Sequence, residues 1–231
     1  MRVAIAEDDP EMRAYVAAAL TDGGHKVETF PNGRDMITGL QRDTFDLVMV
    51  DWNMPAKDGM DVIRWAHEHL SPAPPIIVLT SRSDKSDVVS ALEAGADDYI
   101  VKPETADVIR ARVAAALRRT GPRPSNDRVE AFGPYHFDKL TSSVRFKDKD
   151  VNLTAKEFAL AKLFFENHHR PLARGYILQM IWNSVADLPT RTLDMHVSRI
   201  RAKLELRPEN GYNLHTVFGF GYRLESFAGE E

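Results

Sequence analysis

Residues 46–59 read Asp46-Leu-Val-Met-Val-Asp51-Trp-Asn-Met-Pro-Ala-Lys-Asp-Gly59, and this stretch decides the fold of the first half of the chain. Residues 47–50 form an apolar run rich in β-branched side chains. Such a run predicts a strand buried on both faces, as in a parallel sheet covered by helices. Asp51 stands where this strand is expected to end.

Similar runs recur on both sides of this stretch, and helical patterns separate them. The expected strands are residues 3–6, 27–30, 47–50, 76–79 and 99–101, and the expected helices are residues 11–21, 33–41, 58–69, 84–94 and 105–119. Five such strand–helix units predict a doubly wound α/β domain over residues 1–119, with a flavodoxin-like parallel sheet of order 2-1-3-4-5.

The pattern changes after residue 119. Residues 120–128 contain two prolines and a glycine among polar residues, which is typical of a linker. Residues 129–231 are interpreted as a second domain, with short antiparallel strands over 129–153 and a hairpin ending over 217–224. Helices are expected from the capping box Thr154-Ala-Lys-Glu157 to about residue 167, over 175–182, and from Thr190 or Arg191 to about 204.

Composition narrows the class of protein. The 231 residues include no cysteine, which excludes disulfides and thiolate metal sites and suits a reducing cytoplasm. No run approaches the roughly 18 apolar residues of a membrane span, so we expect no membrane association. Residues 1–120 hold 14 Lys and Arg against 20 Asp and Glu, whereas residues 121–231 hold 16 against 14. The mildly basic second half permits nucleic-acid binding without requiring it.

Polar side chains follow four of the predicted strands where ligands bind in an open α/β sheet. They are Glu7, Asp8 and Asp9 after the first strand, Asp51 after the third, Thr80 after the fourth and Lys102 after the fifth. Crowded carboxylates repel unless a cation intervenes, and Mg²⁺ prefers a few carboxylates with water and phosphate. A carboxylate can also accept a phosphoryl group, whose charge a metal and a lysine would offset. A lone aspartate after a strand is more often a helix cap, but the whole set favours phosphoryl chemistry.

Residues 1–119 resemble the receiver domain of two-component response regulators. The resemblance lies in residues 46–59, in Leu79-Thr80-Ser81 and in Asp97-Asp-Tyr99-Ile-Val-Lys102-Pro103. It implies that Asp51 is the phosphoacceptor and that Lys102 contacts the phosphoryl group. It also implies a switch pair of Thr80 and Tyr99, and Mg²⁺ ligands from Glu7, Asp8, Asp51 and the Asn53 carbonyl. Asp9 is expected to cap the next helix. Glu104 departs from the family, which usually has an aromatic residue there.

The predicted helix over residues 191–204 has two distinct faces. Its apolar stripe consists of Leu193, Val197, Ile200 and Leu204, and its opposite face carries Arg191, Met195, Ser198, Arg199 and Ala202. Arg201 and Lys203 lie on the flanks. An outer face with arginines can enter a DNA major groove, although the pattern alone is more typical of a solvated amphipathic helix.

Residues 129–224 resemble the winged-helix DNA-binding domain of the OmpR/PhoB family. The matching motifs are residues 153–158, residues 191–204 and Thr216-Val-Phe-Gly-Phe-Gly-Tyr-Arg223. The resemblance implies that Arg199 reads base edges and that Arg191, His196, Arg201 and Thr216 contact phosphates; Lys203 is added to this surface. The region of Trp182 would form a loop that contacts RNA polymerase. Phe218 stands at the wing tip, where a basic residue is common, and phenylalanine releases no counterions.

These observations predict a transcription regulator rather than an enzyme, phosphorylated by a sensor histidine kinase and binding promoter DNA as a homodimer. The resemblance implies pairing through the fourth helix, fifth strand and fifth helix. Residues expected on that face are Val88, Leu92, Asp98, Val108 and Arg112, with Asp98 facing Arg112 of the partner. Val88 and Val108 replace a charge pair of the family. Two alternatives are an aspartyl-phosphate enzyme, which would need a substrate domain, and a phosphorylation-independent DNA-binding protein with a vestigial receiver.

Overall fold

The computed structural model describes residues 1–81, 85–120, 127–183 and 190–227. The chain divides into two compact units, Met1–Gly121 and Pro122–Glu231. Most of the predicted linker, residues 120–128, lies outside the described residues. Within the described residues, no helix combines the length and the apolar character needed to cross a membrane.

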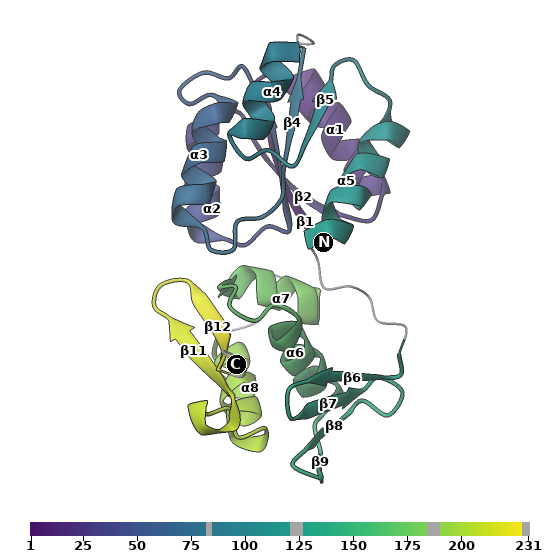
Figure 1. The fold of residues 1–231 in the computed structure, drawn as a ribbon, viewed down its shortest axis with the longest axis vertical. Helices are drawn as coiled ribbons and strands as arrows, with labels where there is room; N and C mark the ends of the chain where they lie inside the picture. The colour runs from purple at the N-terminus through teal and green to yellow at the C-terminus, as the bar shows by residue number, and fades with distance from the viewer. Residues whose placement is uncertain (82–84, 121–126, 184–189, 228–231) are drawn as a thin grey trace. The chain divides into compact units, whose positions relative to one another are not determined.

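The first unit is a five-stranded parallel sheet with helices on both faces (Figure 1). The strand order is β2-β1-β3-β4-β5, which confirms the predicted order. The strands are β1 (Arg2–Ala6), β2 (Lys26–Phe30), β3 (Leu47–Asp51), β4 (Ile76–Thr80) and β5 (Asp98–Val101). The helices are α1 (Pro10–Asp22), α2 (Gly33–Arg42), α3 (Gly59–His69), α4 (Lys85–Glu93) and α5 (Ala106–Thr120).

Two apolar cores lie on opposite faces of this sheet. Helices α1 and α5 cover one face, where Val16 and Val113 pack against Ile5. Helices α2, α3 and α4 cover the other face. Strands β1, β3 and β4 are buried along their whole length, as the apolar runs predict. Strand β2 differs, because it is an edge strand and only Phe30 is buried there.

Side-chain hydrogen bonds stabilise the segments in which α1 and α5 begin. Asp9 Oδ1 accepts hydrogen bonds from the backbone N–H groups of Glu11 and Met12 at 2.8 and 3.0 Å, which confirms its predicted capping role. Before α5, Glu104 Oε1 accepts the backbone N–H of Thr105 at 2.8 Å. Glu104, which stands where the family usually has an aromatic residue, therefore stabilises the turn that leads into α5.

The second unit begins with an antiparallel sheet in the order β6-β7-β8-β9. Its strands are β6 (Val129–Phe132), β7 (Tyr135–Asp138), β8 (Ser143–Phe146) and β9 (Lys149–Val151). The chain continues through α6 (Ala155–Glu166), β10 (Leu172–Ala173), α7 (Arg174–Trp182), α8 (Thr190–Lys203), β11 (Tyr212–Val217) and β12 (Gly221–Ser226). The capping box of Thr154 and Glu157 is present, as predicted.

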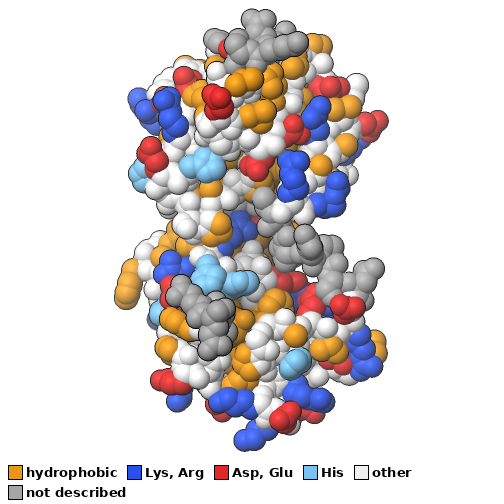
Figure 2. Space-filling view, in the orientation of Figure 1, with side chains coloured by type: hydrophobic (Ala, Val, Ile, Leu, Met, Phe, Trp, Pro, Cys, Tyr) orange, Lys and Arg blue, Asp and Glu red, His pale blue; other side chains and the backbone are white. Residues whose placement is uncertain are grey.

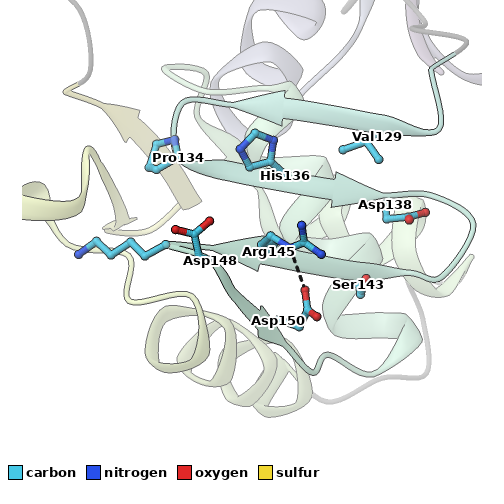
Figure 3. Close-up of a pocket in the computed structure, with 9 residues that line it drawn as sticks. Val129, Pro134, His136, Asp138, Ser143, Arg145, Asp148 and Asp150 are labelled. Carbon is cyan, nitrogen blue, oxygen red and sulfur yellow. Dashed lines mark hydrogen bonds and ion pairs between the residues drawn. The ribbon is translucent and has the colours of Figure 1, made fainter.

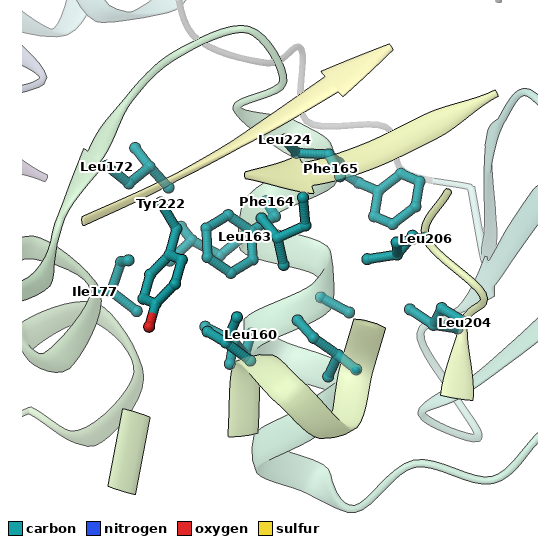
Figure 4. Close-up of a cluster of buried hydrophobic side chains, with 14 of the residues drawn as sticks. Leu160, Leu163, Phe164, Phe165, Leu172, Ile177, Leu204, Leu206, Tyr222 and Leu224 are labelled. Atoms are coloured by element: carbon teal, nitrogen blue, oxygen red, sulfur yellow. The ribbon is translucent and has the colours of Figure 1, made fainter. Parts of the chain in front are cut away.

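A single aromatic-rich core joins the sheet, the helices and the hairpin of this unit (Figure 4). Phe165 packs against Tyr135 and Tyr212, with ring centroids 5.0 and 4.8 Å apart. The hairpin β11–β12 also pairs with β10, a two-residue strand that the sequence analysis did not predict. A Cβ on Gly221 would lie 2.0 Å from the Leu172 carbonyl oxygen, so only glycine permits this close pairing.

Candidate functional site

The predicted rim residues meet at the carboxyl end of the parallel sheet. Glu7 follows β1, Asp51 ends β3, Thr80 ends β4 and Lys102 follows β5. Carboxylate oxygens of Glu7, Asp8 and Asp51 all lie within 4.8 Å of one another. The topology thus assembles three acids that are 44 residues apart at the extremes, because parallel strands end on the same edge.

Lys102 lies between two of these acids. Its Nζ is 2.6 Å from Glu7 Oε2 and 3.3 Å from Asp51 Oδ1. Arg13 approaches the backbone of the same segment, since its Nη1 donates to the carbonyl oxygens of Glu7 and Asp8 at 2.6 and 3.2 Å. Positive charge is therefore aimed at the rim from α1 and from the residue after β5.

Burial opposes ionisation of the two inner acids. Glu7 is 1% exposed and Asp51 is 6% exposed. Desolvation raises the pKa of each carboxyl, while the hydrogen bond from Lys102 acts in the opposite direction. The pKa of both groups is raised on balance, so the lysine does not fully compensate for burial and mutual repulsion.

The donor set fits a hard divalent cation. It offers carboxylate oxygens from two buried residues and from Asp8, which is exposed and open to solvent. Mg²⁺ favours such a site, with few protein oxygens and room for water or phosphate. Asn53 is exposed two residues beyond Asp51, and its carbonyl as a ligand remains a prediction.

The two predicted switch residues lie on neighbouring strands beside this pocket. Thr80 is fully buried at the end of β4, and Tyr99 is 8% exposed on β5. The Tyr99 ring packs edge-on against Trp52, with centroids 6.5 Å apart. The tyrosine is therefore held inward in this structure, next to the residue that follows Asp51.

The predicted pairing face mixes exposed and packed residues. Leu92 on α4 is 46% exposed, whereas Val88 is partly buried and packs against the core of the unit. Val108 on α5 is half-buried. Val89, which the sequence analysis did not single out, is 51% exposed. Apolar side chains gather on the surface over α4 in Figure 2.

Asp98 and Arg112, which are predicted to pair between two chains, form an ion pair within one chain in the structure. Arg112 Nη1 lies 3.0 Å from Asp98 Oδ1 of the same chain. The two side chains meet there because β5 and α5 are neighbours within one unit. The pairing of Asp98 with Arg112 of a partner chain stays a prediction.

Helix α8 has the two faces that its sequence predicts. Leu193, Val197 and Ile200 are fully buried, as is Leu204 directly after the helix. The opposite face is exposed and carries Arg191, Met195, Ser198, Arg199 and Ala202. The packing of the stripe fixes the helix, so its arginine-bearing face points to solvent.

The flanking cations of α8 are engaged inside the unit. Arg201 donates from Nε to the Leu214 carbonyl at 2.8 Å and from Nη2 to Thr216 Oγ1 at 3.2 Å. Burial lowers the pKa of Arg201. Lys203 Nζ lies 2.7 Å from Glu157 Oε2, and that carboxylate is 1% exposed. Both side chains thus stabilise the fold, and their contacts with DNA remain predictions.

The other predicted DNA contacts occupy varied environments. His196 is half-buried, with its ring 5.2 Å from that of Trp182 at the end of α7. Thr216 is exposed on β11. The loop expected after Trp182 falls on residues 184–189, outside the described residues.

A hollow lies on the sheet β6–β9 of the second unit (Figure 3). His136, Arg145 and Asp150 are among the residues that line it. Arg145 Nε lies 3.1 Å from Asp150 Oδ1, and both side chains are well exposed. An exposed ion pair of this kind contributes little to stability, and the lining shows no catalytic arrangement.

Comparison with known proteins identifies both halves of the chain. The family described as response regulator receiver domain matches residues 3–114. The family described as transcriptional regulatory protein, C terminal, matches residues 148–224. These matches cover the acidic pocket and the region from the capping box to the hairpin.

Two relatives match the chain over nearly its whole length. The chain is 38% identical over 222 residues to the transcriptional regulatory protein AfsQ1 of Streptomyces coelicolor, covering 95% of this chain and 96% of that protein. It is 35% identical to the sensory transduction protein RegX3 of Mycobacterium tuberculosis, covering 96% and 98%. A solved structure, that of the Thermotoga maritima OmpR/PhoB homolog DrrB, is similar with a TM-score of 0.47 and 28% identity, covering 97% of this chain and 99% of that one.

The crowding of the pocket predicts how one substitution changes stability. Asp51→Asn removes a buried charge beside Glu7, so we expect the metal-free protein at neutral pH to gain roughly 1 kcal/mol of unfolding free energy. The raised pKa values give the sign of the pH dependence. Above these pKa values, the charged carboxylates lower the unfolding free energy of the wild type. The stability advantage of Asp51→Asn should therefore shrink as the pH falls toward about 4, where the carboxyls become protonated.

Thermal denaturation with and without Mg²⁺ measures this effect. Saturating Mg²⁺ should raise the Tm of the wild type more than that of Asp51→Asn, because the variant loses one carboxylate ligand. Asp22→Asn, which changes an exposed acid on α1, is the control and should behave as the wild type. A destabilised Asp51→Asn protein with an undiminished response to Mg²⁺ would contradict the analysis.

Proposed function

Because the chain belongs to the OmpR/PhoB family of two-component response regulators, which control transcription, we propose that phosphorylation of Asp51 by a sensor histidine kinase controls its binding to promoter DNA. The observation that carries this proposal is the joint presence of the acidic pocket and the arginine-bearing face of α8 in one chain. We place this activity in the cytoplasm, where the promoter DNA lies.

The pocket supports a phosphoryl-transfer role for named residues. The Asp51 carboxylate would attack the phosphorus atom of the donor, form an acyl phosphate and release the donor's leaving group. Mg²⁺, when bound by Glu7, Asp8, Asp51 and the Asn53 carbonyl, would offset the charge of the phosphoryl oxygens. Lys102, which lies 3.3 Å from Asp51 Oδ1, would contact one of those oxygens.

The switch residues supply a route from the pocket to the surface. Thr80 is buried at the end of the strand next to that of Asp51, which supports a hydrogen bond from its hydroxyl to a phosphoryl oxygen. Movement of Thr80 would open space for Tyr99, which lies on the neighbouring strand β5. Repacking of Tyr99 would then alter the face formed by α4, β5 and α5, through which we propose that phosphorylated chains form a homodimer.

The DNA surface is proposed on α8 and the hairpin. Arg199 would hydrogen-bond base edges in the major groove, while Arg191, His196, Arg201, Lys203 and Thr216 would lie along the phosphates. RNA polymerase is a further possible partner, through the region after Trp182. These roles are those of a transcription regulator. An aspartyl-phosphate enzyme would need a substrate domain, whereas the second half of this chain matches a transcriptional regulatory domain.

The phosphoacceptor assignment is tested by labelling with a small phosphodonor. Wild-type protein should incorporate phosphate from acetyl phosphate in the presence of Mg²⁺, because the metal offsets the charge of the donor. Asp51→Asn should abolish the label, and chelation should do the same to the wild type. Asp22→Asn should label normally. Undiminished labelling of Asp51→Asn would refute the assignment, and an unlabelled wild type would favour the vestigial-receiver alternative.

Base readout by Arg199 is tested against a phosphate contact by Arg191. Both side chains are exposed on α8, which makes them a matched pair, whereas Arg201 also anchors the hairpin. Arg199→Ala should narrow the affinity gap between selected and unrelated DNA by about 1–3 kcal/mol. Arg191→Ala should weaken binding to both and reduce the salt slope by about one. Identical behaviour of the two variants in salt titrations would show that the division of roles is wrong.

Dimerisation is tested at Leu92, because Val88 packs against its own core and its replacement would disturb the fold. Leu92→Asp should weaken the beryllofluoride-activated dimer by about tenfold or more, since a charge would replace apolar surface. Sedimentation across a salt series measures this. The wild-type dimer should respond weakly to salt. Leu140→Asp, in an exposed turn of the second unit, is the control. A dimer that Leu92→Asp leaves intact would exclude this face.

A further inference from the structure

The connection between β1 and α1 carries two of the three acids of the pocket. Strand β1 ends at Ala6 and α1 begins at Pro10, so the connection consists of Glu7, Asp8 and Asp9. Glu7 is buried, whereas Asp8 is exposed. The position of the Asp8 carboxylate therefore depends on the backbone of the connection, because its own side chain is not packed into the core.

Arg13, in the first turn of α1, contacts the backbone of all three residues of this connection. Its Nη1 donates to the carbonyl oxygens of Glu7 and Asp8 at 2.6 and 3.2 Å. Its backbone N–H donates to the Asp9 carbonyl oxygen at 2.9 Å. The Glu7 backbone N–H donates to the Phe30 carbonyl oxygen at 3.2 Å, which anchors the start of the connection to β2.

The side-chain hydrogen bonds of Arg13 end on main-chain oxygens. They therefore do not compete with a metal for the carboxylate oxygens of Glu7 and Asp8. A guanidinium group holds its donors in a rigid plane, so little of its freedom is lost for each hydrogen bond that it forms. Ordering a backbone segment costs conformational entropy, and a segment ordered during folding does not incur that cost again when a ligand binds.

We propose that Arg13 is a positioning residue of the phosphorylation site. It holds the connection in the conformation in which Asp8 meets Glu7 and Asp51, and it thereby raises the affinity of the pocket for Mg²⁺. This inference rests on the proposed function and deepens it, because it names a residue that controls metal loading without binding the metal. Groups that orient metal ligands in this way typically change metal affinity by about 10–100-fold when they are removed.

The positive charge of Arg13 predicts an effect of the opposite sign. A guanidinium group near the pocket repels a divalent cation, so removal of its charge alone would tighten Mg²⁺ binding. Removal of a positioning residue weakens Mg²⁺ binding instead. The direction in which Mg²⁺ affinity changes therefore distinguishes the two roles of Arg13.

The first experiment titrates the full-length, unphosphorylated protein with Mg²⁺ alone and measures binding by calorimetry. Arg13→Ala should raise the Kd about tenfold. Arg13→Lys should retain most of the wild-type affinity, because its ammonium group donates hydrogen bonds to the same carbonyl oxygens. Arg34→Ala, which removes an exposed arginine of α2, is the matched control for charge and should bind as the wild type does. Unchanged or tighter binding by Arg13→Ala would overturn the proposal.

Amide hydrogen exchange tests the order of the connection without any metal. The backbone N–H groups of Glu7 and Asp9 donate to the Phe30 carbonyl and to Glu7 Oε1, so their exchange reports local opening of the connection. Both should exchange faster in metal-free Arg13→Ala than in the wild type, while the amides of β3 keep their protection. Equal exchange of Glu7 and Asp9 in the two proteins would show that Arg13 does not order the connection.

Labelling by acetyl phosphate across a series of Mg²⁺ concentrations separates metal loading from the reaction itself. In Arg13→Ala the Mg²⁺ concentration that gives half-maximal labelling should rise by the same factor as the Kd, while the maximal rate stays that of the wild type. A lower maximal rate would place Arg13 on the phosphodonor and overturn the positioning role. If the wild type neither binds Mg²⁺ nor becomes labelled, the proposed function itself fails. If the wild type does both and Arg13→Ala matches it, this inference alone fails.

Discussion

One lysine shared between buried carboxylates is the interaction on which the first unit depends. Lys102 Nζ reaches both Glu7 and Asp51, and Asp8 adds a third carboxylate at the same edge. One positive charge does not balance three negative charges in a site where two of them are almost fully buried. The excess makes the pocket receptive to a divalent cation and sensitive to any change of charge at Asp51.

The second unit depends on a different constraint, the complete burial of one stripe of α8. The helix cannot rotate, because Leu193, Val197 and Ile200 are fully buried. The position of each cation in the sequence therefore decides whether it faces solvent or the rest of the unit. Arg191 and Arg199 face solvent, while Arg201 and Lys203 are drawn against the hairpin and the capping box. The same packing that exposes the arginine-bearing face of α8 therefore leaves Arg201 and Lys203 engaged with the hairpin and with Glu157 of α6.

Further contacts fix the hairpin β11–β12 against α8. Arg201 lies 5.5 Å from the Tyr222 ring centroid, and the Tyr222 hydroxyl donates to Asp194 of α8. The guanidinium group of Arg174, at the start of α7, lies 5.0 Å from the centroid of the same Tyr222 ring. Helix α8 and the hairpin are thus tied together by polar contacts as well as by the core, so the turn at Phe218 keeps a defined position relative to Arg199.

Sequence patterns alone determined the five strand–helix units, the rim of Glu7, Asp8, Asp51, Thr80 and Lys102, the capping box and the two faces of α8. These features follow from local periodicity and from the rule that parallel strands end on one edge, so they need no knowledge of distant contacts. Tertiary structure alone decided that Asp98 meets Arg112 within one chain, that Lys203 neutralises Glu157, and that Val88 packs inward while Val89 and Leu92 stay exposed. The reason is that the partner of a long charged side chain, and the burial of a residue on a partly covered helix, depend on which elements the fold brings alongside it.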